Sequence, residues 1–257
     1  MSLRILAFVL LLLACLAGYC LAQDLDDGAS PRIVGGTRAV AGQFPHQISL
    51  RRNDRFVCGG SILSTSYVLT AGHCVKSGNN VTPASQLSIR AGTLLLSGGG
   101  VRVNVAQVVV HPQYGNSAGH DVAVLRLGST LLFSSLIKAI PLASSDPPDN
   151  ALVDISGWGA IFHNGPVSDQ LLYAQVRNLA RDTCKQKYYS RLSDTTMCLL
   201  HEAKKGACHG DSGGPATYGG SLVGVASFVL GGCGRAAPDG YGRISVLRQW
   251  IRQTAKL

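Results

Sequence analysis

The chain is organised around the stretch Cys208-His-Gly-Asp-Ser-Gly-Gly-Pro215, which has Ser212 at its centre. A serine hydroxyl is a weak nucleophile, so a catalytic serine needs a base to take its proton and donors to hold a developing oxyanion. Gly210 lacks a Cβ, so its N–H and that of Ser212 can turn toward one point. A Gly/Ser-rich loop is the alternative interpretation, but the pattern runs unbroken from the cysteine to the proline. The stretch therefore predicts a nucleophilic serine.

Two further stretches contain the partners that such a serine requires. In Leu69-Thr-Ala-Gly-His-Cys74, His73 directly precedes a cysteine and follows an apolar alternating run. In Gly119-His-Asp-Val-Ala-Val-Leu-Arg-Leu127, Asp121 stands at the head of a run with the period of two that is typical of a strand. A single histidine is usually structural, and a single aspartate before a strand is usually a turn residue. The three contexts together predict nucleophilic catalysis by serine, histidine and aspartate.

On these three stretches the chain resembles the serine proteases of the chymotrypsin/trypsin family, from Ile33 to the C-terminus. The order His73, Asp121, Ser212 is that of the chymotrypsin type and differs from the orders in subtilisins and α/β-hydrolases, which argues against a lipase or esterase. The resemblance implies that Ser212 attacks the scissile carbonyl, that His73 accepts and returns the proton, and that Asp121 orients the imidazole. The N–H groups of Gly210 and Ser212 would form the oxyanion hole.

The fold class that the resemblance implies is all-β, with two six-stranded antiparallel barrels packed together and a C-terminal α-helix. The protease domain would span 33–257, with barrel one at about 33–145 and barrel two at about 146–245. The sequence agrees, because short alternating apolar runs recur between breaks rich in Gly, Pro and Asn. These runs are His46–Leu50, Gly60–Thr70, Gln86–Gly92, Val101–Val110, Asp121–Leu127, Ala151–Gly157, Leu171–Val176 and Ser221–Val229.

A single helix is predicted from periodicity, over residues 246–255. It places Leu247, Trp250 and Ile251 on one face at the spacing of an amphipathic helix. We expect this face to pack against the barrels, which makes Trp250 a core residue.

The chain begins with two segments that we expect to be removed. Residues 1–22 contain an apolar run shorter than the roughly 20 residues of a membrane span and end on a small residue, as secretory signals do. Residues 23–32 form a polar propeptide that ends in Arg32. By resemblance, cleavage after Arg32 frees the amine of Ile33, which pairs with Asp211. The sequence thus predicts a secreted, extracellular zymogen that a trypsin-like protease activates.

The chain is basic, with 23 Lys and Arg against 14 Asp and Glu and a net charge of +9. Such a charge favours anionic surfaces or substrates. Dense basic clusters interleaved with aromatic residues are absent from the sequence, so we expect no nucleic-acid partner, and we expect no membrane partner. The charge does support one alternative function, that of a catalytically weak basic binding or antimicrobial protein on the same fold. Such proteins typically lack a triad residue, and this chain has all three.

The cysteines that follow the predicted signal are even in number, which in a secreted chain predicts disulfides but leaves their pairing open. The resemblance implies the pairs Cys58–Cys74, Cys184–Cys198 and Cys208–Cys233. Their spacings are not those of zinc sites, and residues 88–103 contain no Asp or Glu for a calcium loop. We therefore expect no metal and no cofactor. The sequon at Asn80 is a candidate for glycosylation.

By resemblance, seven residues form the substrate-binding pocket: Gly206, Ala207, His209, Ser227, Phe228, Val229 and Asp239. Gly206 stands where trypsins have aspartate, so the pattern is not that of a trypsin. Val229 replaces a glycine and narrows the pocket as in elastases, whereas Asp239 replaces a glycine near the pocket floor, as in crustacean collagenase-type proteases. Two interpretations stay open: Asp239 points into the pocket and attracts Lys or Arg, or it faces solvent and the pocket prefers small or medium apolar side chains.

The sequence therefore predicts a secreted serine endopeptidase with polypeptide substrates. We expect a broad elastase- or chymotrypsin-like preference, some acceptance of basic residues, and a digestive role. Protein protease inhibitors are expected as further partners, and the protein is expected to be a monomer.

Overall fold

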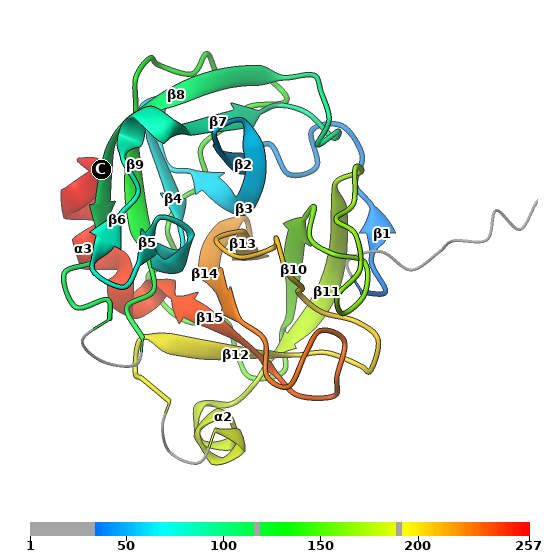
Figure 1. The fold of residues 1–257 in the computed structure, drawn as a ribbon. Helices are drawn as coiled ribbons and strands as arrows, with labels where there is room; N and C mark the ends of the chain where they lie inside the picture. Colours follow the sequence, from blue (N-terminus) through cyan, green and yellow to red (C-terminus); the bar gives the residue numbers. More distant parts are fainter. Residues whose placement is uncertain (1–33, 116–118, 189–191) are drawn as a thin grey trace, which may run out of the picture. The chain divides into compact units, whose positions relative to one another are not determined.

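The computed structural model describes residues 34–115, 119–188 and 192–257. The predicted signal at 1–22, the propeptide at 23–32 and Ile33 lie outside the described residues. In the described part, two antiparallel β-barrels account for most of the regular structure (Figure 1). None of the helices in that part combines the length and the hydrophobicity that a membrane span requires.

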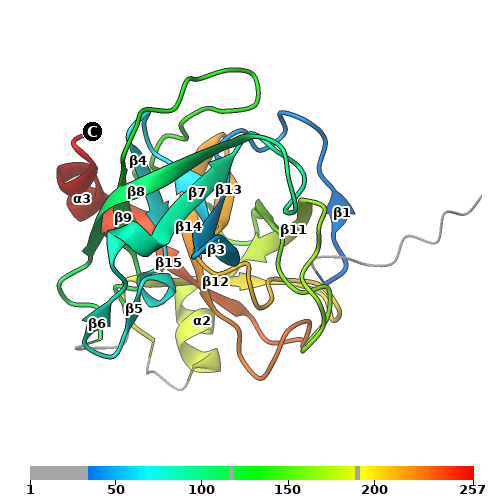
Figure 2. The ribbon, with the colours of Figure 1, turned by 45° about the horizontal axis from the view of Figure 1, so that its top comes forward.

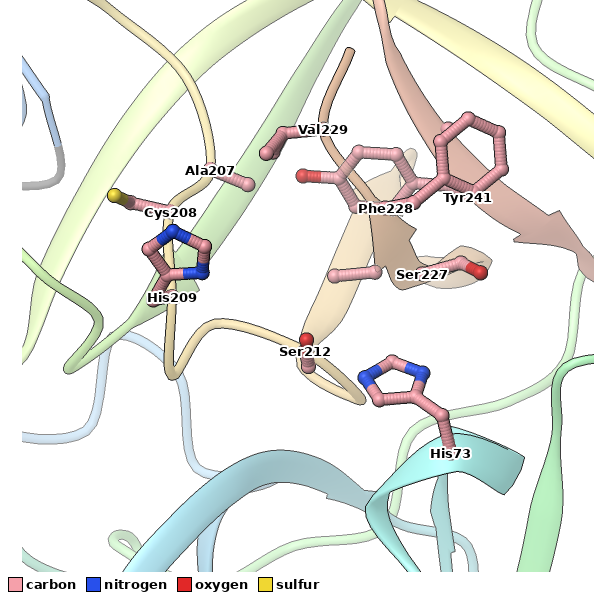
Figure 3. A pocket seen from close by; sticks show the side chains of 11 residues that line it. His73, Ala207, Cys208, His209, Ser212, Ser227, Phe228, Val229 and Tyr241 are labelled. Carbon is pink, nitrogen blue, oxygen red and sulfur yellow. The ribbon is translucent and has the colours of Figure 1, made fainter. Parts of the chain in front are cut away.

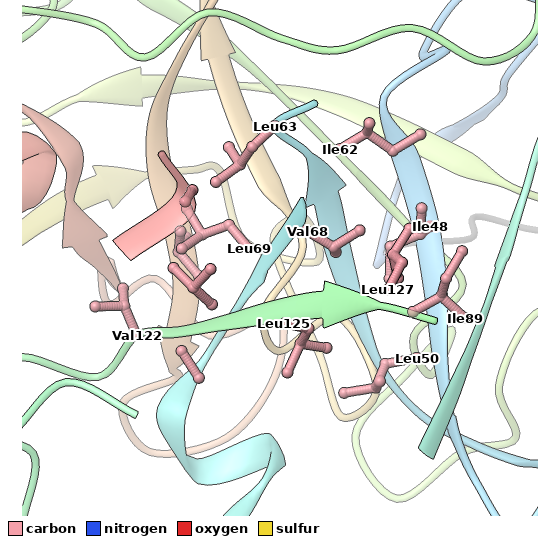
Figure 4. Packing of buried hydrophobic residues seen from close by; sticks show 14 of the residues in the cluster. Ile48, Leu50, Ile62, Leu63, Val68, Leu69, Ile89, Val122, Leu125 and Leu127 are labelled. Carbon is pink, nitrogen blue, oxygen red and sulfur yellow. The ribbon is translucent and has the colours of Figure 1, made fainter. Parts of the chain in front are cut away.

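The first barrel is a closed sheet in the order β2-β3-β4-β9-β8-β7. Its interior is filled by the apolar side of each alternating run, including Ile48, Leu50 and Ile89, all of them fully buried (Figure 4). Val68 of one strand lies opposite Leu125 of the next, so the alternation fixes which side chains face inward. The strands are β2 (Gln47–Arg52), β3 (Arg55–Ile62), β4 (Tyr67–Thr70), β7 (Leu87–Ala91), β8 (Val101–Val110) and β9 (Ala123–Leu127).

The second barrel has the order β11-β10-β13-β14-β15-β12 and closes through the pairing of β11 with β12. Its strands are β10 (Leu152–Gly157), β11 (Leu172–Asn178), β12 (Thr196–Leu200), β13 (Pro215–Tyr218), β14 (Ser221–Phe228) and β15 (Asp239–Arg243). The short β1 (Thr37–Arg38) pairs with β11. The assignment of the whole segment 33–145 to the first barrel thus needs a correction, because β1 extends the sheet of the second.

The connections carry short elements. The 3₁₀ turn η1 (Gly72–Cys74) follows β4, and a second turn, η2 (Ala84–Gln86), precedes β7. Between these turns, β5 (Lys76–Ser77) and β6 (Asn80–Val81) form a two-stranded ribbon, on which Asn80 is exposed.

Two helices are described, α2 (Arg181–Lys187) and α3 (Ile244–Ala255). Figures 1 and 2 both place α3 beside β9, and its residues Ile244, Leu247 and Ile251 belong to the same buried cluster as the first barrel. Trp250, expected in the core, is only half-buried, and its ring lies 4.6 Å from that of His111.

The two-barrel, all-β fold and the C-terminal helix are confirmed. The run Gly60–Thr70, predicted as one strand, is instead a hairpin of β3 and β4. Its break lies at the polar Ser64-Thr-Ser66, where the hydroxyl of Ser64 accepts the N–H of Ser66. The helix α2 was not predicted, because it is short and has no apolar stripe.

Candidate active site

His73 and Asp121 are brought together by the pairing of β4 with β9. Thr70 of β4 lies opposite Ala123 of β9, so the short segment that follows one strand meets the short segment that precedes the other. The Nδ1 atom of His73 lies 2.7 Å from Oδ2 of Asp121, and the backbone N–H of His73 donates to Oδ1 over 2.8 Å. The imidazole is therefore held in one orientation by both oxygens of a single carboxylate.

The surroundings of Asp121 keep this carboxyl ionised. Burial raises its pKa, but hydrogen bonds from the His73 ring, the Ser227 hydroxyl and the His73 N–H together hold the pKa below its ordinary value. An ionised carboxylate can only accept hydrogen bonds, so Nδ1 of His73 carries a hydrogen. In the neutral ring, Nε2 is then free to accept a proton.

Ser212 lies in the loop that connects β12 to β13, and both barrels fix its position. The N–H of Gly59, from the first barrel, donates to the Ser212 carbonyl over 2.8 Å, and the next residue, Gly213, donates to Ala226 of the second barrel over 2.7 Å. A Cβ on Gly213 would come within 2.2 Å of the Thr70 hydroxyl, so the close approach requires glycine. In Figure 3 Ser212 and a ring nitrogen of His73 face each other across the mouth of a pocket.

Two backbone donors beside Ser212 remain available. Ala160 donates to the carbonyl of His209 over 2.7 Å, which turns the N–H of Gly210 to the opposite side of the planar peptide. Gly210 has a φ of +98°, which favours glycine. Within the described residues, neither the N–H of Gly210 nor that of Ser212 donates to a protein acceptor. The pair can stabilise a developing oxyanion.

A cavity of about 300 Å³ opens next to Ser212 (Figure 3). Five residues of the predicted pocket line it, namely Ala207, His209, Ser227, Phe228 and Val229. The aromatic ring of Phe228 packs over Gly240, where a Cβ would lie 2.2 Å from the ring. Four lining residues were not predicted from the sequence, and they are Cys208, Ala226, Gly240 and Tyr241.

Comparison with known proteins agrees with this geometry. The model of the trypsin family, described as Trypsin, matches residues 33–251. The chain belongs to the trypsin family of serine proteases. It is 44% identical over 225 residues to serine protease SP24D of Anopheles gambiae, covering 88% of this chain and 82% of that protein. It is 38% identical to trypsin delta of Drosophila melanogaster, covering 97% of this chain and 100% of the relative.

Among solved structures, the protease is similar to neuropsin, a serine protease expressed in the limbic system of mouse brain. The TM-score is 0.78 at 28% sequence identity, and the match covers 86% of this chain and 98% of neuropsin.

Asp211, next to Ser212, is a buried carboxyl of this protease. It accepts the N–H of Gly159 over 2.8 Å and that of Cys208 over 2.9 Å. Burial nevertheless raises its pKa to about 7. Within the described residues it forms no salt bridge. Val34, also buried, forms a β-bridge with Gly206.

Asp239 occupies neither of the two positions that the sequence left open. It is 3% exposed, so it does not face solvent, and it does not line the cavity. Its Oδ2 accepts the N–H of Ala207 over 2.9 Å, which places the carboxylate directly behind the pocket wall. Gly206 likewise lies behind the wall, not on it. The Nε2 atom of His201, a residue that sequence reasoning missed, lies 3.3 Å from the same oxygen.

The three disulfides that the resemblance implied are present in the structure. Cys58–Cys74 joins β3 to η1 and so supports His73, Cys184–Cys198 joins α2 to β12, and Cys208–Cys233 joins the two sides of the pocket. Two groups of His and Cys side chains come together in the described part, around His73 and around His209. Their cysteines are oxidised, so they offer no thiolate ligands to a metal.

Proposed function

We propose that Ser212, His73 and Asp121 form the catalytic triad of this protease. The observation that carries the proposal is the 2.7 Å contact of His73 Nδ1 with Asp121, with Ser212 on the other side of the ring. The Ser212 hydroxyl attacks the scissile carbonyl while Nε2 of His73 takes its proton and passes it to the leaving amine. Asp121 stabilises the imidazolium that forms.

The acyl-enzyme is then hydrolysed by the same groups. Water takes the place of the leaving amine, His73 removes its proton, and the Ser212 oxygen departs with a proton from the imidazolium. In both halves of the reaction the N–H groups of Gly210 and Ser212 hold the oxyanion. Donors that are fixed in place before substrate arrives need little reorganisation in the transition state.

We further propose that the protein is secreted as a zymogen and activated by cleavage between Arg32 and Ile33. Asp211 supports this, because a buried carboxylate without a cation is costly and would be stabilised by a new ammonium group. Val34 supports it as well, since the residue that follows Ile33 already lies against Gly206 at the base of the pocket. A trypsin-like protease would make the cut.

For substrates we propose a broad preference for small and medium apolar side chains, with some acceptance of basic ones. Val229 and Phe228 narrow the cavity, and the carboxylate of Asp239 lies behind Ala207 and does not project into it. We also propose that this protease is a digestive enzyme that acts outside the cell as a monomer, with protein protease inhibitors as further partners.

A peptide-library profile tests this function. Protein cleaved after Arg32 is compared with Arg32→Gln, which stays uncleaved, and with Asp239→Gly. We expect turnover only in the cleaved forms, mainly after apolar residues, and loss of cleavage after Lys and Arg in Asp239→Gly. Full turnover by uncleaved Arg32→Gln would refute the zymogen. Folded, cleaved protein without turnover would favour the basic binding protein instead.

A further inference from the structure

A second histidine–aspartate pair lies beneath the specificity pocket, apart from the triad. The pairing of β12 with β15 sets Leu199 opposite Asp239, so His201, just after β12, comes beside the carboxylate. The side chains of His201 and Asp239 are 1% and 4% exposed, with 3.3 Å between Nε2 and Oδ2. The pair is therefore sealed from solvent, and charges interact more strongly in the protein interior than in water.

The hydrogen-bond partners of His201 fix how many protons the pair holds. Its Nδ1 lies 2.9 Å from the Glu202 carbonyl oxygen, which can only accept, so Nδ1 carries a hydrogen. Within the described residues, Nε2 has no polar neighbour except Asp239. A neutral ring would set a lone pair against the carboxylate, so one more proton must lie between them. The N–H of Ala207 donates to the same oxygen of Asp239, so this oxygen acts as an acceptor for both neighbours.

This shared proton makes the pair neutral, and the pair lies one layer of backbone from the substrate. Ala207 lines the cavity with one side and binds Asp239 through its N–H. Gly206 makes room for the arrangement, because a Cβ there would lie 2.5 Å from the His201 ring and 2.8 Å from Oδ2 of Asp239. The net charge of the pair therefore acts on any side chain in the cavity.

We propose that His201 is a specificity-determining residue. By neutralising Asp239 it lets the pocket accept uncharged side chains, and loss of the shared proton turns the same pocket toward arginine and lysine. The inference rests on the proposed function, since it concerns the substrates of that site.

Other ionisable groups around the pair do not replace His201 as countercharge. Tyr188 donates its hydroxyl to the Pro238 carbonyl, and burial raises its pKa to about 12. Burial likewise keeps the pKa of Tyr241 well above its ordinary value, so both phenols stay neutral. Asp211 can only add negative charge. The nearby surface cation Lys205 is already paired with the exposed Glu202, at 2.8 Å.

The sign of the pH dependence follows from the pKa of His201. Burial lowers this pKa, but the contact and charge of Asp239 and the hydrogen bond to the Glu202 carbonyl outweigh burial, so the pKa lies above its ordinary value. The pair therefore loses its proton at a higher pH than an ordinary histidine does, as the solution becomes more alkaline. A change in the catalytic machinery with pH alters turnover of both substrates alike, so a ratio of two substrates isolates the pair.

The test uses protein cleaved after Arg32 and two peptide amides that differ only in having arginine or leucine before the scissile bond. Arginine stays charged throughout the range from pH 6 to 10. We expect the arginine-to-leucine ratio of kcat/KM to rise about 10-fold with pH in the wild type. In His201→Gln the arginine-to-leucine ratio should exceed that of the wild type, because an ionised Asp239 then has no countercharge, and in Asp239→Asn the ratio should stay low at every pH. Asn keeps the shape of the side chain and its amide oxygen can accept the Ala207 N–H, so this variant should fold.

Glu202→Gln is the matched control, because it changes a surface charge on the same loop without touching the pair, and it should follow the wild type. A flat ratio in the wild type overturns the proposal whatever the variants do, as does a ratio in His201→Gln that matches the wild type. Folded wild type that cleaves neither peptide refutes the proposed function itself, a result distinct from an unchanged ratio.

Discussion

The hydroxyl of Ser227 donates to Oδ2 of Asp121 over 2.6 Å, and this hydrogen bond connects the two barrels beside His73. Asp121 lies just before β9 of the first barrel, which pairs with the strand β4 that leads to His73, whereas Ser227 belongs to β14 of the second barrel. The same oxygen faces Nδ1 of His73. The second barrel thus supplies Ser212 and also a donor that fixes the carboxylate opposite it.

Ser227→Ala should lower kcat/KM by about 10-fold, because a hydrogen bond to a charged group is worth roughly 1.5–3 kcal/mol. Its loss should also raise the pKa of Asp121. Ser61→Ala is the control, since the buried Ser61 hydroxyl has no hydrogen-bond partner among the described residues. Steady-state kinetics on one peptide substrate decides the matter, and equal activities of the two variants would contradict the role of Ser227.

Asp211→Asn should change how the stability of the uncleaved chain depends on pH. Burial raises the pKa of Asp211 from 3.8 to about 7, so the folded chain keeps a proton that the unfolded chain releases. Stability should therefore fall as pH rises through this window, by up to about 4 kcal/mol, and Asn removes this contribution. Urea unfolding at pH 4.5 and 7.5 measures it. The same pH dependence in both proteins would rule out the raised pKa.

His46 should give the stability of the folded chain the opposite dependence on pH. It is 7% exposed, its Nε2 has no polar partner among the described residues, and burial lowers its pKa to about 4 from 6.5. Between pH 6.5 and pH 4 the unfolded chain therefore binds a proton at His46 that the folded chain does not bind. The free energy of unfolding should fall over this pH range, by up to about 3 kcal/mol. The free energy of unfolding of His46→Phe, measured with urea, should rise relative to that of the wild type as the pH becomes acid. A difference that stays constant with pH would exclude this effect.

The disulfides offer a matched pair of deletions. Cys208–Cys233 and Cys184–Cys198 are separated by 25 and 14 residues, so replacing either with serines should cost about 3 kcal/mol of unfolding free energy. Only Cys208–Cys233 borders the pocket. Its removal should also lower kcat/KM at least several-fold, whereas removal of the other should not. Kinetics on folded protein tests this, and an equal loss of activity would show that the pocket does not depend on its own disulfide.

Ser212, His73 and Asp121 could be predicted as site residues from the sequence, because each lies in a short, local pattern. The strands of the first barrel could be predicted for a similar reason, since apolar residues such as Ile48 and Leu50 alternate with polar ones. The strand β15 reads Asp-Gly-Tyr-Gly-Arg and has no such alternation, because packing between β12 and β14 determines it. That long-range pairing alone brings His201 to Asp239. The pocket base therefore could not be predicted from local sequence.

The most direct test of Ser212 as the nucleophile is the stoichiometry of the acyl-enzyme. Protein cleaved after Arg32 is mixed with a chromogenic ester, and the initial burst of leaving group is compared with the amount of free Ile33 amine. We expect one leaving group per amine, with the acyl group found on the peptide that contains Ser212, and no burst from Ser212→Ala. A burst of the same size from folded Ser212→Ala would contradict the assignment.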